Sequence, residues 1–176
     1  MVALLRGVNV GGHGKLPMAD LRAMAEELGY GDVATYIQSG NLVLSTSASA
    51  AAVARDLAAA IAAETSVAPA VVVRTRSQLA KVVRDNPFLG RGEDAGFQHV
   101  LFTEGPAKAA VAGLDLPSYA PEEATAVGHE LYLVLPNGVG RSKLAVDVGR
   151  QKGVVGTMRN WRTVTTVLAM ADEAAG

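Results

Sequence analysis

Residues 33–44 of the chain read VATYIQSGNLVL, two apolar runs on either side of a polar turn that contains a glycine. The runs at 33–37 and 42–44 have the composition of short strands, and the turn Gln38-Ser39-Gly40-Asn41 between them is typical of a β-hairpin. Asn41 follows the glycine and is a residue type that tolerates the left-handed conformation of such turns. We therefore place a hairpin at the centre of the first half of the chain.

Helix and strand patterns flank this hairpin on both sides. They are a buried strand at 2–8, a helix that begins at Pro17 and ends at Gly29, a helix that Ser47 or Ser49 caps, and a strand at 69–73. In the second helix, Val53, Leu57 and Ile61 recur every four residues, which places them on one face. The order β-α-β-β-α-β is the ferredoxin-like pattern.

The second half is less regular, but its order echoes the first. Its expected elements are a short helix capped by Ser77, a strand at 97–103, a short helix after Pro106, a hairpin at 125–135 turned at Gly128-His129, a short helix at 142–148 and a last helix at 161–171. Asn137-Gly138 marks a turn between the hairpin and the short helix that follows it. The boundary between the halves falls at 75–92, and no low-complexity linker marks it.

Composition limits the classes of function. The chain has 176 residues, 49% of them hydrophobic, which suits one domain or two small subdomains with a buried core. It has no cysteine, so disulfides, thiolate metal sites and thiol catalysis are excluded. The net charge of −1 argues against general nucleic-acid affinity. We find no signal peptide or membrane-span pattern, and we expect a cytoplasmic protein without a membrane partner.

Positive charge is collected in one stretch. From residue 141 to residue 162 the chain carries six basic residues and the single acid Asp147, whereas 85–130 carries eight acids and two bases. The six basic residues are Arg141, Lys143, Arg150, Lys152, Arg159 and Arg162. One interpretation is a solvated face or an internally neutralised one, because charge runs are usually solvated. The other is an anion site, since Arg141 and Lys143 stand at an expected helix start and Arg159 stands beside Asn160 and Trp161.

The glycine-rich loop 7–15 joins a strand to a helix but matches no nucleotide motif. Asn9 and Leu16 break the P-loop spacing, and Pro17 breaks the dinucleotide fingerprint. A GXXG spacing exists at 11–14, but in nucleotide-clamping domains that loop joins two helices. A flexible turn and an anion contact through Lys15 both stay open. Arg6 interrupts the apolar strand before this loop, so we expect it either to form an ion pair or to point into a site.

Catalytic constellations are not apparent. His13, His99 and His129 are scattered, and neither an HExxH nor a GxSxG motif is present. His99 lies in the middle of an expected strand, where a sheet histidine is the simpler interpretation. We expect no metal site and no cofactor, and whether the protein is an enzyme stays open.

Several segments together resemble the bacterial domain-of-unknown-function family 1697. They are LLRGVNVGG at 4–12, TYIQSGNLVL at 35–44, Asn86-Pro87-Phe88, GRSKL at 140–144 and TMRNWRT at 157–163. The resemblance implies an α+β protein of two ferredoxin-like subdomains. We expect both to be βαββαβ-type subdomains with antiparallel sheets packed together, residues 1–76 forming the first and residues 77–176 the second. It implies no activity, and no catalytic role is carried over from it.

These observations predict a basic cleft between the subdomains that binds a phosphate-bearing ligand, either a small molecule such as a nucleotide or a nucleic acid. Its lining residues would be Arg6, Asn9, Lys15, Ser39, Asn41, Arg141, Ser142, Lys143, Arg159, Asn160 and Trp161, with Trp161 as a wall or stacking platform. The alternatives are a structural or protein-interaction module, and an enzyme that uses Lys143 or Ser142 on an anionic substrate. The sequence leaves the oligomeric state open.

Overall fold

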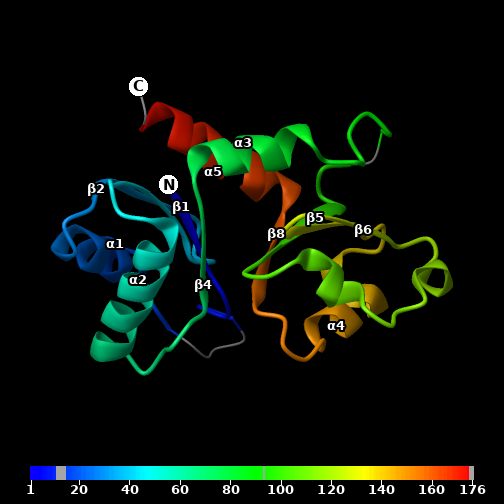
Figure 1. Ribbon diagram of the computed structural model, residues 1–176, viewed down its shortest axis with the longest axis horizontal. Coiled ribbons are helices and arrows are strands. Elements are labelled where there is room, and N and C mark those ends of the chain that lie inside the picture. Colours follow the sequence, from blue (N-terminus) through cyan, green and yellow to red (C-terminus); the bar gives the residue numbers. More distant parts are fainter. Residues whose placement is uncertain (11–14, 93, 175–176) are drawn as a thin grey trace. The chain divides into compact units, whose positions relative to one another are not determined.

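A computed structural model describes residues 1–10, 15–92 and 94–174 of the chain (Figure 1). The chain divides into two compact units. Unit 1 consists of Met1–Lys81 together with Thr165–Gly176, and unit 2 consists of Val82–Val164.

Unit 1 contains a four-stranded sheet in the order β2-β3-β1-β4, in which each pair of neighbours is antiparallel. Its elements, in chain order, are β1 (Val2–Leu5), α1 (Met18–Glu27), β2 (Gly31–Tyr36), β3 (Asn41–Ser45), α2 (Ala50–Glu64) and β4 (Val71–Arg74). This is the β-α-β-β-α-β order that the sequence predicts. The sequence offered Ser47 and Ser49 as the N-cap of α2. Ser49 is the cap, because its hydroxyl accepts a hydrogen bond from the backbone N–H of Ala52.

Helices α1 and α2 pack on one face of this sheet. Leu21 of α1 and Leu57 of α2 are fully buried in one cluster with alternate strand residues such as Ala3 and Leu5 of β1. Burial of each such leucine contributes about 1.5–3 kcal/mol relative to an exposed side chain. Residues one position apart on a strand face opposite sides, so the shared cluster fixes which face the helices cover.

The hairpin turn between β2 and β3 differs from the prediction in one respect. Asn41 is the first residue of β3 and is fully buried, while Gly40 and Ile37 take the left-handed conformation, with φ of 71° and 47°. A Cβ atom on Gly40 would lie 2.7 Å from the Cβ of Leu5, so the position also needs glycine for space. The expectation that Asn41 itself supplies the left-handed conformation is therefore wrong.

Unit 2 contains a second four-stranded antiparallel sheet, in the order β6-β7-β5-β8. Its strands and longer helix are β5 (Gln98–Thr103), β6 (Glu123–Val127), β7 (Glu130–Val134), α4 (Lys143–Gly149) and β8 (Gly156–Asn160). Three 3₁₀ segments complete it, η1 (Ala107–Val111), η2 (Leu116–Tyr119) and η3 (Val139–Arg141). The strand order repeats that of unit 1, so the prediction of an α+β fold with two antiparallel sheets is confirmed.

Two helices begin in one unit and end in the other, α3 (Arg76–Arg84) and α5 (Trp161–Glu173). The cap of α3 is Thr75, not Ser77 as the sequence suggested. The Thr75 hydroxyl accepts from the N–H of Gln78 at 3.2 Å, and the Gln78 side chain accepts from the N–H of Thr75 at 2.9 Å. This reciprocal pair is a capping box.

Two strands at the ends of the chain also depart from expectation. The first strand ends at Leu5, so Arg6 lies after it and is exposed, rather than interrupting a buried strand. The edge strand β8 was not predicted at all. In the described part of the chain no helix has the length and apolar character needed to cross a bilayer.

Candidate functional site

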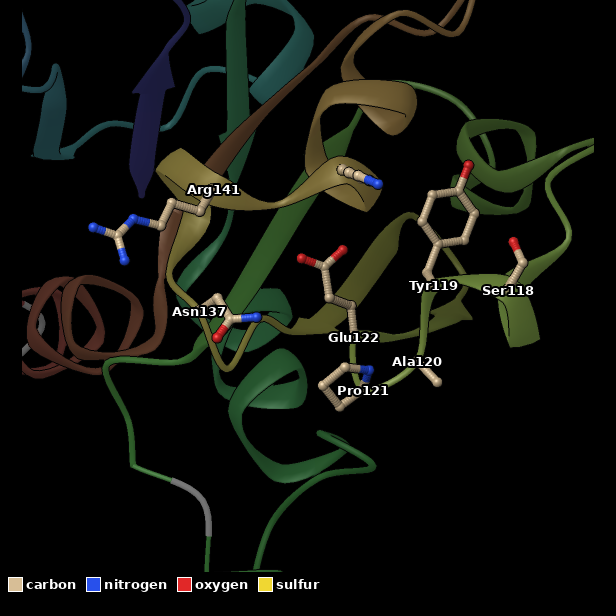
Figure 2. Close-up of a pocket in the computed structure, with 8 residues that line it drawn as sticks. Ser118, Tyr119, Ala120, Pro121, Glu122, Asn137 and Arg141 are labelled. Carbon is tan, nitrogen blue, oxygen red and sulfur yellow. The ribbon is translucent and has the colours of Figure 1, made fainter.

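Unit 2 has a hollow of about 420 Å³ beside the start of α4 (Figure 2). It is lined by residues from three places in the sequence, namely Ser118, Tyr119, Ala120, Pro121, Glu122, Asn137, Arg141 and Lys143. The segment 118–122 links η2 to β6, Asn137 lies in the turn after β7, and the two basic residues flank the N-cap of α4. The hollow therefore joins a part of the acidic segment to the start of the basic run.

A second hollow of about 380 Å³ adjoins the first and shares Arg141 and Lys143 with it. Its other walls are Gly140, Ser142, Val146, Asp147 and Arg150. Arg141 and Lys143 are both exposed, and neither makes a side-chain hydrogen bond or ion pair with another described residue. Two unneutralised cations thus stand on the wall common to both hollows.

Two backbone N–H groups in the first turn of α4, those of Leu144 and Ala145, are satisfied by side chains of the protein. Ser142 is the N-cap, and its hydroxyl accepts from the N–H of Ala145 at 2.8 Å. The Glu122 carboxylate accepts from the N–H of Leu144 at 2.9 Å. Ser142 is 1% exposed, and its hydroxyl is used by the helix. The side chains of Arg141 and Lys143 are the positive charges at this helix start.

Glu122 is the acid of this hollow. The residue is 8% exposed, and Figure 2 shows its carboxylate among the lining side chains, while Arg141 extends outward and away from it. The bond to Leu144 uses Oε2. Among the described residues nothing donates to Oε1, and no ion pair joins Glu122 to a cation.

Tyr119 forms a fixed wall. Its hydroxyl donates to Asp147 Oδ2 at 2.8 Å, and Asp147 Oδ1 lies 3.9 Å from Arg150. The hydrogen bond to Asp147, with burial as a second cause, raises the pKa of Tyr119. The phenol therefore stays protonated, and the ring is held at the edge of the hollow.

Three predicted site residues lie near the loop after β1, in unit 1. Arg6 and Lys15 are exposed and have no side-chain partner among the described residues. Asn9 is half-buried, and its amide bonds the backbone on both sides of the loop, accepting from Leu16 N and donating to Leu16 O and Gln38 O. These three hydrogen bonds all have backbone partners, so the Asn9 side chain stabilises the loop. The glycines at 11–14, with His13, lie outside the described residues.

Ser39 and Asn41 hold the hairpin turn of unit 1. Asn41 is fully buried, and its Nδ2 donates to Tyr36 O at 3.0 Å and to Ser39 Oγ at 2.9 Å. These bonds tie the first residue of β3 to the last residue of β2. They give both side chains a structural role at the turn.

The third predicted cluster lies where β8 passes into α5. Arg159 is buried on β8, donates to Thr157 Oγ1 at 2.6 Å and to Met158 O at 2.9 Å, and has its pKa lowered to about 10 by burial. Asn160 caps α5, because its Oδ1 accepts from the N–H of Thr163. Trp161 is 8% exposed.

The basic run and the acidic segment are joined by an ion pair between Arg162 and Asp94. Arg162 lies 3.2 Å from Asp94, and both side chains are more than half exposed, so the pair contributes about 0–1 kcal/mol. Arg141, Lys143 and Lys152 have no ion-pair partner among the described residues. Internal neutralisation therefore covers only part of the run.

The histidines form no catalytic or metal cluster in the described part of the chain, where no group of three metal-binding side chains occurs. His99 is buried on β5, its ring nitrogen Nδ1 lies 3.2 Å from Phe97 O, and burial lowers its pKa. It is a sheet histidine, as the sequence suggested. His129 is exposed and bonds Glu104 O.

Sequence reasoning identified only Arg141 and Lys143 among the eight lining residues, and the missed residues include Tyr119, Glu122 and Asn137. Tyr119 and Glu122 lie in the acidic segment, and their partners are 28 and 22 residues away, so no local spacing marks them. Asn137 did carry a signal, since Asn-Gly turns expose their side chains at loop tips, where binding residues concentrate.

Comparisons with known proteins place the chain in a family without assigning an activity. A solved structure, described as that of conserved bacterial protein SP0830 from Streptococcus pneumoniae, is similar with a TM-score of 0.76 and 23% identity, covering 97% of each chain. That likeness concerns the fold. No curated protein matches the sequence. Residues 1–132 match the family described as "Protein of unknown function (DUF1697)", a match that ends before the motifs at 140–144 and 157–163. The chain therefore belongs to the DUF1697 family.

Proposed function

We propose that this protein binds a phosphate-bearing ligand at the hollow of unit 2, through Arg141 and Lys143. The observation that carries the proposal is that both cations are exposed, lack a partner among the described residues, and line the same hollow of about 420 Å³. Binding sites for small molecules have volumes of roughly 300–1,000 Å³, so the hollow is large enough for a nucleotide-sized ligand.

The chemistry of the two side chains suits phosphate. A guanidinium offers paired N–H donors that match two phosphate oxygens, and an ammonium adds a compact point charge. Single contacts of exposed charges are weak because water and salt screen them. The affinity therefore depends on both residues acting on one anion, and it should fall as salt rises.

The test is titration calorimetry with pyrophosphate, ADP and a short single-stranded oligonucleotide at two salt concentrations. We expect binding that weakens with salt and that the double variant Arg141→Ala/Lys143→Ala reduces at least about tenfold, which corresponds to about 1.4 kcal/mol. Lys108→Ala is the matched control, because Lys108 is an exposed lysine of unit 2 that lines neither hollow. Absence of binding to all three probes, or equal losses in the control, would refute the proposal.

The wider prediction adds residues of the first half to this ligand site. The other predicted ligand contacts stay predictions, namely those of Arg6, Asn9, Lys15, Ser39, Asn41, Ser142, Arg159, Asn160 and Trp161. The cleft between the halves, the domain limits 1–76 and 77–176 and a cytoplasmic location also stay predictions. Arg6→Ala and Lys15→Ala in the same titration test the contacts of Arg6 and Lys15. Loss of affinity in these variants would support a site that extends beyond unit 2.

A further inference from the structure

Glu122 is out of place in a site for an anion alone. Its carboxylate lies in the hollow lined by Arg141 and Lys143, yet it pairs with neither of them among the described residues (Figure 2). Oε2 is used by the N–H of Leu144, whereas Oε1 has no described donor. The residue is only 8% exposed.

A buried carboxylate oxygen without a donor is costly. Leaving a buried acceptor unsatisfied costs about 1–3 kcal/mol, and more for a charged group. Glu122 lines the hollow, so a hydroxyl or amine of a bound ligand can reach its carboxylate and supply the missing hydrogen bond. A ligand with only negative groups would be repelled by the same oxygen.

We propose that the ligand is a ribonucleotide, with a ribose hydroxyl that donates to Glu122 Oε1 while the phosphate contacts Arg141 and Lys143. This inference rests on the proposed function. Proteins that bind dinucleotides read the ribose in this way, with an acidic side chain that accepts from the 2′-hydroxyl. A carboxylate close to phosphate-binding cations thus fits a ligand whose hydroxyls and phosphate are a few bonds apart.

The remaining walls fit the other parts of a nucleotide. The Tyr119 ring is fixed by the bond from its hydroxyl to Asp147, and a fixed aromatic ring can stack on a base. Asn137 is exposed and offers both an amide donor and a carbonyl acceptor. Arg141 points away from Glu122 in Figure 2, so a ligand that contacts both would hold its phosphate at Arg141 and its ribose nearer Glu122.

The experiment compares ADP with 2′,3′-dideoxy-ADP in calorimetric titrations of wild type and Glu122→Gln. Glutamine keeps an acceptor for Leu144 N but loses the charge. We expect wild type to prefer ADP by about tenfold or more, the range of a hydrogen bond to a charged group, and the variant to lose most of that preference. Pyrophosphate should bind Glu122→Gln at least as tightly as it binds wild type, because a repulsive charge is gone. If Glu122 had only a structural role, pyrophosphate would bind the variant more weakly than wild type. Glu104→Gln, an exposed acid outside the hollow, is the charge-matched control.

The outcomes separate the two proposals. Equal binding of ADP and the dideoxy analogue, with dependence on Lys143, would overturn the ribose assignment and leave anion binding intact. Absence of binding to pyrophosphate, nucleotides and oligonucleotides would overturn both. An RNA oligonucleotide against the DNA of the same sequence tests whether the ribose belongs to a polymer, because the 2′-hydroxyl distinguishes them. Preference for RNA with weak ADP binding would support the ribose assignment and identify RNA as its source.

Discussion

The Asn9 side chain donates from Nδ2 to the main-chain oxygen of Gln38 at 2.8 Å, across 29 residues of sequence. The same amide donates to Leu16 O at 2.8 Å and accepts from Leu16 N at 2.9 Å. Asn9 itself has a φ of 56°, in the left-handed region. One residue thus joins the loop after β1 to the hairpin turn, and it does so from a conformation that few side chains accept.

Asn9→Ala and Asn9→Gly separate these two contributions. Both variants lose the three hydrogen bonds, each worth about 1 kcal/mol, while only alanine also carries the left-handed strain of about 1–2 kcal/mol. We expect urea unfolding to show Asn9→Gly destabilised by about 2–3 kcal/mol and Asn9→Ala by about 1 kcal/mol more. Equal losses in the two variants would mean that the conformation of the loop changes when the hydrogen bonds are removed.

Most elements of the fold could be predicted because their signals are local. The hairpin at 33–44 carries its glycine turn, and Ser49 and Ser142 stand directly before helices that they cap. The strand β8 was missed because its register with β5 buries polar side chains, Thr157 and Arg159, so it lacks the alternation of a half-buried strand. The strand is instead specified by its pairing with β5, whose partner residues lie 53 (Thr103 and Gly156) to 61 (His99 and Asn160) positions away in the sequence.

Local sequence signals also predicted part of the candidate site. Arg141 and Lys143 stand out by charge, and the structure brings them to one hollow. Glu122 and Tyr119 reach that hollow only through tertiary hydrogen bonds, to Leu144 N and to Asp147. Asn9, conversely, looked like a ligand group in a glycine loop, but its side chain bonds backbone. The sequence alone does not tell whether a polar side chain in a loop bonds a ligand or the protein's own backbone.

The hydroxyl of Tyr132 should be important for stability. It donates to Val82 O at 3.0 Å, and Val82 lies in the last turn of α3, where carbonyls lack helical partners. Tyr132 is 2% exposed, and burial raises its pKa, so the phenol remains a donor at all ordinary pH. We expect Tyr132→Phe to lower the free energy of unfolding by about 1–3 kcal/mol, measured by chemical denaturation. Tyr119→Phe, which removes a half-buried hydroxyl, should cost about 1 kcal/mol or less.

Burial of His99 predicts a pH dependence of stability. Burial lowers its pKa from the ordinary value of 6.5, so the unfolded chain takes up a proton that the native chain resists. Above pH 6.5, His99 adds no pH dependence to the free energy of unfolding. Below pH 6.5, the protein loses stability as the pH falls, because the unfolded chain binds the proton more tightly. We expect His99→Gln to show a smaller loss than wild type between about pH 7 and about pH 5.5, a window above the ordinary carboxylate range. His129→Gln, at an exposed histidine, is the control for removal of an imidazole.

The capping box of α3 predicts coupled effects. Thr75 and Gln78 each accept from the other's backbone N–H, so either substitution to alanine leaves one N–H of the first turn to water. We expect Thr75→Ala to cost about 1 kcal/mol, and Gln78→Ala less. Ser77→Ala, at the serine that the sequence suggested as the cap, should change stability by less than Thr75→Ala. A larger loss at Ser77 in thermal unfolding would restore the original assignment.

The start of α4 separates the structural role of Glu122 from its proposed role in binding. Ser142 and Glu122 accept from adjacent backbone N–H groups, of Ala145 and Leu144, and both residues are buried. Glu122→Ala leaves the Leu144 N–H unsatisfied and should lower the free energy of unfolding by about 1–3 kcal/mol, whereas Glu122→Gln keeps an acceptor and should lose about 1 kcal/mol or less. Ser142→Ala should cost about 1 kcal/mol, as N-cap substitutions do. If Glu122→Gln instead unfolds as readily as Glu122→Ala in chemical denaturation, the charge itself stabilises the helix start, and the ribose preference must then be tested at a temperature where both variants are folded.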